Sequence, residues 1–116
     1  MMTNMPFLVV NGQLSLKGCQ LGLPHPVVDA FAYRHLIVVR VEPSAGFIFN
    51  RNVYGISDEG EVLWQIEESP HGTQEDKPYV NINVGQNDDL IAGNWNGVSY
   101  SVNPENGKIT VVSFDK

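Results

Sequence analysis

The sequence predicts an all-β protein with about nine antiparallel strands in meandering hairpins, folded as a sandwich or a small barrel. Three observations support this class. Apolar and polar residues alternate over most of the chain, which is the period of a half-buried strand, and no stretch shows the spacing of an amphipathic helix. Two Asn-Gly pairs, at 11–12 and 96–97, mark tight hairpin turns. The chain also contains 11 glycines and 7 prolines, which suits a turn-rich β protein.

The first hairpin is predicted on either side of Asn11-Gly12. A two-residue type I′ turn needs a positive φ at both central positions, and Asn-Gly is the pair that adopts it most readily. This register places Val9 opposite Leu14 and Phe7 opposite Leu16. All four side chains then share one face, so the turn and the apolar pattern agree on the buried side.

The next segment, residues 18–31, is expected to be irregular, because Pro24 and Pro26 interrupt a hydrogen-bonded ladder. Within it, residues 26–31 are interpreted as one short helical turn. The nearly continuous apolar run at 35–41 then predicts a central strand that is covered on both faces.

The turn Asp58-Glu59-Gly60 predicts another hairpin. Glycine suits the left-handed position at the end of a three-residue loop, because it has no Cβ to clash with the backbone. In this register Ile56 pairs with Val62 and Tyr54 pairs with Trp64. Ile56, Val62, Tyr54 and Trp64 would then share one face of the hairpin with Ile66.

The second half continues with a long loop and two further strand pairs. The polar loop at 69–78 is expected to be the most mobile segment. Alternation over 79–84 directs three apolar side chains inward: Val80, Ile82 and Val84. A two-residue turn at Asn96-Gly97 places Trp95 on the apolar face, so Trp95 and Trp64 are both predicted to lie in the core.

The composition indicates a single domain over residues 1–116, because a chain of 116 residues has the usual size of one domain. Cys19 is the single cysteine, which excludes an intrachain disulfide and favours a reducing compartment. No basic residue precedes the short apolar run near the N-terminus, and no stretch reaches the roughly 20 apolar residues of a membrane helix. These features predict a cytoplasmic protein that does not bind membranes.

Charge is distributed unevenly along the chain, whose formal net charge is −6. Residues 1–57 contain two acidic and four basic side chains, whereas residues 58–116 contain eleven acidic and three basic ones. An acidic surface repels nucleic acid and attracts basic partners over a distance. The charge therefore argues against nucleic-acid binding and is compatible with a basic protein partner.

Two parts of the sequence repeat one another. Residues 53–62 and 99–109 each contain an aromatic strand, an acidic turn with glycine, a charged residue and a β-branched residue. The turn glycines Gly60 and Gly107 are 47 residues apart, and Gly12 lies 48 residues before Gly60, which allows a third, degenerate copy. A period in this range is typical of propeller blades.

The stretch from Tyr54 to Trp64 resembles the repeat of quinoprotein-like (PQQ-type) β-propellers, which reads Tyr-Ala-Leu-Asp, a turn with glycine and a strand with tryptophan. The second copy, from Tyr100 to Ile109, keeps the tyrosine and the turn glycine but is followed by no tryptophan. The resemblance implies blade-like repeats. It does not imply that this chain binds the quinone cofactor of the family. A closed propeller needs about four to eight blades, and this chain has two or three, so no cofactor is expected.

The short acidic chain also looks like small stand-alone bacterial proteins. Some of these are uncharacterised, and some are immunity proteins that neutralise toxins. This second resemblance is one of size and charge, and it implies a role in binding another protein.

No catalytic group and no metal site is predicted. Cys19 could form a nucleophile–base pair with one of the three histidines His25, His35 and His71, but their spacing does not require such a contact. The residues His25, Asp29 and His35 lack the spacing of a zinc site. A small enzyme that uses Cys19 or a His/Asp site within residues 18–35 is therefore an alternative rather than the first hypothesis.

The first hypothesis is a non-catalytic protein that binds a basic protein, as an immunity protein does. It follows from the acidic second half, the rigid hairpins and the lack of a catalytic motif. The predicted partner-binding residues are Asp58, Glu59, Glu67, Glu68, His71, Glu75 and Asp76. A third possibility is a structural module that assembles as a homo-oligomer into a propeller-like ring.

Overall fold

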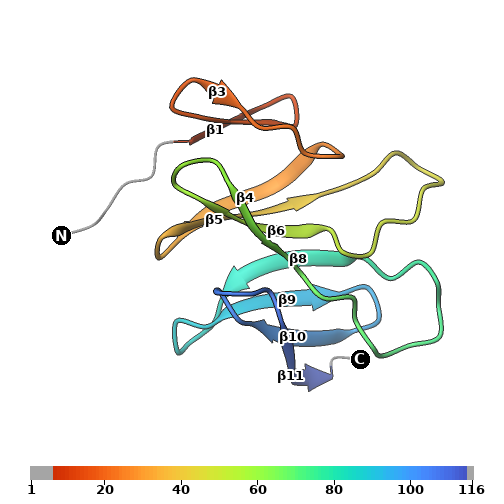
Figure 1. The fold of residues 1–116 in the computed structure, drawn as a ribbon. Helices are drawn as coiled ribbons and strands as arrows, with labels where there is room; N and C mark the ends of the chain where they lie inside the picture. Colours follow the sequence, from red (N-terminus) through yellow and green to blue (C-terminus); the bar gives the residue numbers. More distant parts are fainter. Residues whose placement is uncertain (1–6, 115–116) are drawn as a thin grey trace.

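The computed structural model describes residues 7–114, which form eleven antiparallel strands in three sheets and no helix (Figure 1). The first sheet contains β1 (Phe7–Val10), β2 (Gln13–Leu16) and β3 (Cys19–Gln20). The middle sheet contains β4 (Val27–Tyr33), β5 (Leu36–Val41), β6 (Val53–Ser57) and β7 (Val62–Gln65). The third sheet contains β8 (Tyr79–Val84), β9 (Leu90–Asn94), β10 (Val98–Val102) and β11 (Ile109–Phe114). Within this range, no helix has the length and hydrophobicity needed to cross a membrane.

The three sheets are stacked, with the middle sheet between the other two (Figure 1). One core lies between the middle and third sheets and includes Val38, Trp64 and Tyr100. A second core lies on the opposite face of the middle sheet, where Leu14 of β2 packs with Ile37 of β5. Strand β5 is therefore buried on both faces, which explains its continuous apolar run and confirms the predicted central strand. The all-β class is confirmed, and within residues 7–114 the sheets close into neither a barrel nor a ring.

The predicted first hairpin is confirmed in its register. Val9 pairs with Leu14 and Phe7 with Leu16, across a turn in which Asn11 and Gly12 have φ values of 52° and 77°. The turn chemistry and the apolar pattern select the same pairing, and a shift by one residue would move the leucines away from the core.

The prediction for residues 18–31 is correct only in part. Residues 21–26, which contain both prolines, are irregular as expected. The segment also contains β3 and most of β4, however, and the expected helical turn at 26–31 is wrong, because residues 27–31 are part of a strand. Strand β4 pairs along its length with β5, and the amide of Val27 also donates to the Gly12 carbonyl at 2.9 Å. Pro26 does not interrupt this ladder, because it precedes the strand and its missing N–H is not needed there.

The hairpin at 58–60 forms as predicted at Ile56, which pairs with Val62, but not at Tyr54. A β-bulge between Gly55 and Ile56 shifts the register, so Trp64 lies opposite Gly55 and on the other face from Ile56. The indole lies against the Gly55 backbone: a Cβ added at this position would be 2.2 Å from Trp64 Cε2. Trp64 and Ile66 are buried, but they face the third sheet, and Val62 is exposed.

The second Asn-Gly turn differs from the prediction by one residue. The amide of Gly97 donates to the Asn94 carbonyl at 3.0 Å, and Ser99 pairs with Gly93. Trp95 is therefore in the turn itself and is 63% exposed, so its predicted core position is wrong. The extra residue in the turn shifts the pairing by one. Val98, Tyr100 and Val102 remain buried, but their partners in the core are Leu90 and Ala92 of β9 rather than Ile91 and Trp95.

Strand β8 also departs from simple alternation. A bulge between Tyr79 and Asn81 shifts its pairing with β9. Val80 and Val84 are exposed rather than buried, and Ile82 is half-buried. Tyr79 fills the core position instead, and its side chain is completely buried.

The sequence repeat corresponds to equivalent places in two sheets. The turns with Gly60 and Gly107 each connect the third strand to the fourth, in the middle and third sheets respectively. The Gly12 turn connects the first strand of its sheet to the second, so it is not an equivalent third copy.

Candidate interaction surface

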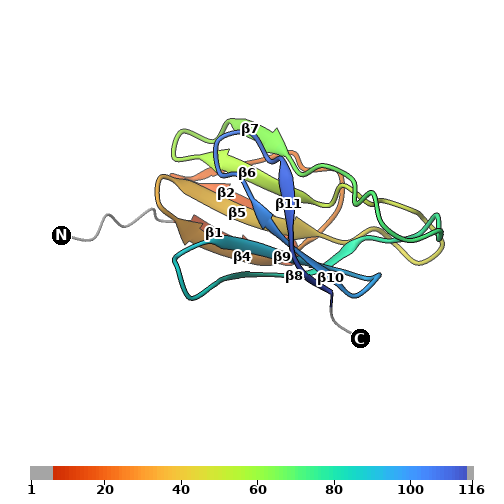
Figure 2. The same cartoon turned by 90° about the horizontal axis from the view of Figure 1, so that it is seen from below.

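Two long loops project side by side from one end of the stacked sheets (Figure 2). One, residues 42–52, connects β5 to β6, and the other, residues 66–78, connects β7 to β8. The turn at 95–97 is at the same end, because β9 also ends there. Alternating strand directions place the connections 34–35, 58–61, 85–89 and 103–108 at the opposite end.

Asn50 joins the two loops directly. Its amide nitrogen donates to the Glu75 carbonyl at 2.7 Å and to Glu68 Oε2 at 3.3 Å. Its amide oxygen accepts a hydrogen bond from the Lys77 backbone at 2.9 Å. One side chain therefore holds the second loop against the first at two backbone positions.

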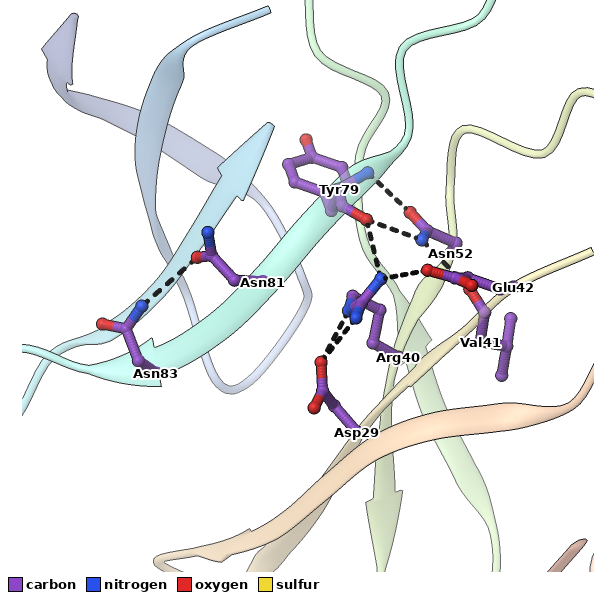
Figure 3. A network of polar contacts seen from close by, with 8 residues as sticks. All are labelled: Asp29, Arg40, Val41, Glu42, Asn52, Tyr79, Asn81 and Asn83. Atoms are coloured by element: carbon purple, nitrogen blue, oxygen red, sulfur yellow. Dashed lines mark hydrogen bonds and ion pairs between the residues drawn. The ribbon is translucent and has the colours of Figure 1, made fainter. Parts of the chain in front are cut away.

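Asn52 binds the start of β8 in the same way, and it is completely buried. Its Nδ2 donates to the carbonyls of Tyr79 and Val41 at 2.9 and 3.1 Å, and its Oδ1 accepts from the Tyr79 amide at 2.9 Å (Figure 3). The side chain thus replaces the backbone of a neighbouring strand and connects the middle sheet to the third.

The Tyr79 side chain links the loop 66–78 to the core between the middle and third sheets. Its hydroxyl donates to the Glu67 carbonyl at 2.7 Å, and the ring packs edge-on against Tyr100. Burial raises the pKa of Tyr79 far above its usual value, and the neighbouring Tyr100, Glu67 and Glu68 raise it further. The phenol is therefore a neutral structural donor at all ordinary pH values.

Arg40 carries a buried charge below the loops, at the boundary between the middle and third sheets (Figure 3). Its Nε and Nη2 are both 2.7 Å from Asp29 Oδ2, and its Nη1 is 3.0 Å from Glu42 Oε2. Nη1 also reaches the Tyr79 carbonyl at 3.5 Å. The two carboxylates neutralise the guanidinium, which is necessary because an unpaired buried charge is strongly destabilising.

Two more asparagines hold the loop 66–78 from the third sheet. Asn94 Nδ2 donates to the Lys77 carbonyl at 2.9 Å. Asn96 Nδ2 donates to Ser69 Oγ and to the His71 carbonyl, both at 2.9 Å. The loop was predicted to be the most mobile segment, but it is anchored near both ends and in its middle.

Ser69, Tyr100 and His71 form a hydrogen-bonded group beneath this loop. Ser69 Oγ is bonded to the Tyr100 hydroxyl, and that hydroxyl is 2.8 Å from His71 Nδ1. Such a set of residue types could serve nucleophilic catalysis. However, Ser69 and Tyr100 are buried, so the group anchors the loop and presents no nucleophile to solvent.

The solvent side of the two loops and the turn combines large apolar side chains with carboxylates. Phe47, Ile48 and Trp95 are 67%, 53% and 63% exposed. Trp95 adjoins the second loop, because its amide donates to the Pro78 carbonyl at 2.9 Å. We define the paired-loop surface as these three residues together with the exposed acids of the second loop: Phe47, Ile48, Trp95, Glu68, Glu75 and Asp76.

The predicted partner-binding residues separate into two groups. Five of them lie on the second loop: Glu67, Glu68, His71, Glu75 and Asp76. Asp58 and Glu59 lie at the opposite end of the sheets, in the turn between β6 and β7. Of the five, Glu67 has a structural role, because its Oε1 accepts from the Ile109 amide at 2.8 Å. His71 is half-buried against Tyr100.

Cys19 is exposed on β3 and lines a hollow of about 250 Å³ together with Lys17, Asp58 and Glu59. None of the described residues that line this hollow is a histidine. The structure therefore does not place Cys19 beside a base of the kind that the enzyme hypothesis needs.

The three histidines are in different places. His25 packs edge-on against Phe49 with ring centroids 4.7 Å apart, His35 lies in the turn after β4, and His71 stacks on Tyr100. Over residues 7–114, no three His, Cys, Asp or Glu side chains are close enough together to hold a metal ion.

The sequence contained a signal for the asparagine anchors that the prediction missed. Asn50-Arg51-Asn52 and Asn94-Trp95-Asn96 are two of the three Asn-X-Asn motifs in the sequence, and each lies shortly before the third strand of its sheet. The other motif, Asn81-Ile82-Asn83, lies within β8. The exposed pair Phe47-Ile48 is also absent from the predicted partner-binding residues.

Comparison with protein-family models matches residues 5–114 to the family described as "Domain of unknown function (DUF7957)". The match spans all three sheets and both loops. A search of curated proteins and a search of solved structures each gave no match.

Proposed function

The chain belongs to the DUF7957 family, whose description assigns no function, and we propose that it is a non-catalytic protein that binds a basic protein through the paired-loop surface. A basic toxin, neutralised as by an immunity protein, is a partner of this chemistry. We further propose that it acts in the cytoplasm, because its single cysteine, Cys19, is free and exposed.

One observation carries the proposal: a group of exposed apolar and acidic side chains is mounted on loops whose backbone is held by four asparagines. Exposed tryptophan and phenylalanine are unfavourable in water and are frequent anchors of protein interfaces. A loop that is already ordered loses little conformational entropy on binding. The surface therefore combines anchors with a rigid support.

Charge defines the class of partner. Eleven of the thirteen acidic residues lie after residue 57, and three of them are on the paired-loop surface: Glu68, Glu75 and Asp76. Carboxylates around apolar anchors accelerate association with a basic surface and discriminate against an acidic one. The same charge argues against nucleic acid as a partner.

The test uses affinity capture followed by binding measurements with the purified partner. The loop variant combines Trp95→Ala with Glu75→Gln, and the matched control combines Asp58→Asn with Glu59→Gln at the opposite end. We expect the loop variant to lose the partner and the control to keep it. Wild-type affinity should fall as salt is raised, because exposed charges are screened. Binding that survives in the loop variant and is lost in the control would refute the proposal.

A second function, an assembly module, is favoured by one specific observation. The sequence repeat occupies equivalent strands of two four-stranded sheets, as blades of a propeller-like ring would. Under this proposal several chains complete a ring through their outer strands. Measurement of the molar mass in solution decides it, since a monomer at micromolar concentration excludes the ring.

A further inference from the structure

A hollow of about 220 Å³ opens beside the paired-loop surface, between the first loop and the start of β8. About half of its wall is apolar, and this part includes Phe47, Phe49, Pro78 and Val80. Two acidic residues, Glu42 and Asp76, also line it, one from each loop. The hollow therefore combines apolar wall surface with negative charge.

The two carboxylates are not equivalent. Glu42 Oε2 is 3.0 Å from Arg40 Nη1, so part of its charge is already neutralised. Asp76 is exposed, and it makes no ion pair or side-chain hydrogen bond with another residue in 7–114. Asp76 is therefore the carboxylate that remains available to a ligand.

This combination matches one kind of ligand group: a long aliphatic stem that ends in a cation. The stem of a lysine or arginine side chain packs on apolar and aromatic surface while its charged end stays near solvent. The cation would gain from the face of Phe47 and from the Asp76 carboxylate. A purely apolar group would gain nothing from the carboxylate, and an anion would be repelled.

We propose that this hollow receives a lysine or arginine side chain of the partner protein, while Trp95 contacts a neighbouring part of the same partner. The inference rests on the proposed function and makes it more specific. It requires the partner to present a protruding cationic side chain, rather than only a basic surface.

The test is an NMR titration of the full chain with three blocked amino acids: N-acetyl-lysine methylamide, N-acetyl-arginine methylamide and N-acetyl-norleucine methylamide. Norleucine supplies the stem without the cation. We expect saturable shifts at the amides of residues 44–49 and 76–80 with lysine, arginine or both, and none with norleucine. Equal shifts with norleucine, or shifts confined to other regions, would overturn the inference.

Two substitutions at exposed positions sharpen this result, and neither removes a core contact. Asp76→Asn and Phe47→Ala should each weaken binding of the cationic probe about two- to fivefold, the range of a solvent-exposed ion pair or cation–π contact. The matched control Asp58→Asn, at the opposite end of the sheets, should leave it unchanged. Unchanged binding of the cationic probe by Asp76→Asn would refute the inference.

The same variants separate this inference from the proposed function. If the captured partner is lost with the loop variant but bound normally by Asp76→Asn and Phe47→Ala, the paired-loop surface is the binding site and the cation pocket is refuted. If both the probe and the partner require Asp76, both proposals are supported.

Discussion

Replacement of Asn52 by alanine tests the asparagine anchors most directly. The side chain is completely buried and makes three hydrogen bonds, to the carbonyls of Val41 and Tyr79 and from the Tyr79 amide. Alanine removes all three and leaves these backbone groups without their partner in a region closed to water. At about 1 kcal/mol for each bond, the free energy of unfolding should fall by about 3 kcal/mol. Urea unfolding followed by the fluorescence of buried Trp64 measures this difference.

Two further variants make the result interpretable. Asn83→Ala removes an exposed asparagine on β8 whose side chain, within residues 7–114, bonds only to Asn81. It should change stability by less than about 0.5 kcal/mol. Asn52→Asp keeps the size but replaces the donating amide with an acceptor facing two carbonyls, so it should be worse than alanine. If Asn52→Ala were no more destabilising than Asn83→Ala, the asparagine anchor would not connect the sheets.

Three other predictions follow from the core and its tyrosines. In urea unfolding, Trp64→Ala should lower the free energy of unfolding by roughly 3–5 kcal/mol and Trp95→Ala by less than about 0.5 kcal/mol, because Trp64 is buried and Trp95 is exposed. Equal losses would contradict this difference in burial. Gly55→Ala forces the Trp64 ring aside and should lower stability by roughly 1–3 kcal/mol, whereas Gly22→Ala, where an added Cβ meets nothing within 4 Å, should not. The free energy of unfolding should fall as pH rises above 10.0, because the unfolded state releases the Tyr79 proton at its ordinary pKa of 10.0 while the folded state retains it. Unfolding measured as a function of pH should show a smaller alkaline decline for Tyr79→Phe. An unchanged slope in this variant would refute the role of Tyr79.

The sequence predicts the fold best where local and long-range requirements coincide. In the hairpin at 7–16 the turn residues and the apolar alternation select one register, and the structure has it. Strand β5 shows its burial on both faces directly in its composition. Neither prediction depends on the position of distant residues.

The prediction fails where a single residue changes the register. The bulge at Gly55 moves Trp64 to the opposite face, and the longer turn at 94–97 moves Trp95 into solvent. Both depend on contacts that are distant in sequence, such as the hydrogen bond from the Trp95 amide to Pro78. Because side chains alternate along a strand, an error of one residue reverses which face is buried.

The sequence predicted the candidate site only in part. The density of acids indicated the second loop, since charge is visible in the sequence alone. The first loop, with Phe47 and Ile48, is brought beside it by Asn50, and nothing local in the sequence predicts that contact. Asp58 and Glu59 were included because of their charge, but the strand directions place them at the other end.

The asparagine anchors hold the second loop mainly through its main chain: the carbonyls of His71, Glu75 and Lys77 and the amide of Lys77. The identity of the side chains at 73–76 does not enter these bonds. Those positions can therefore diverge during evolution while the path of the chain stays the same. Homologues that keep the four asparagines have a ready route to new specificities without rebuilding the β-sheet scaffold.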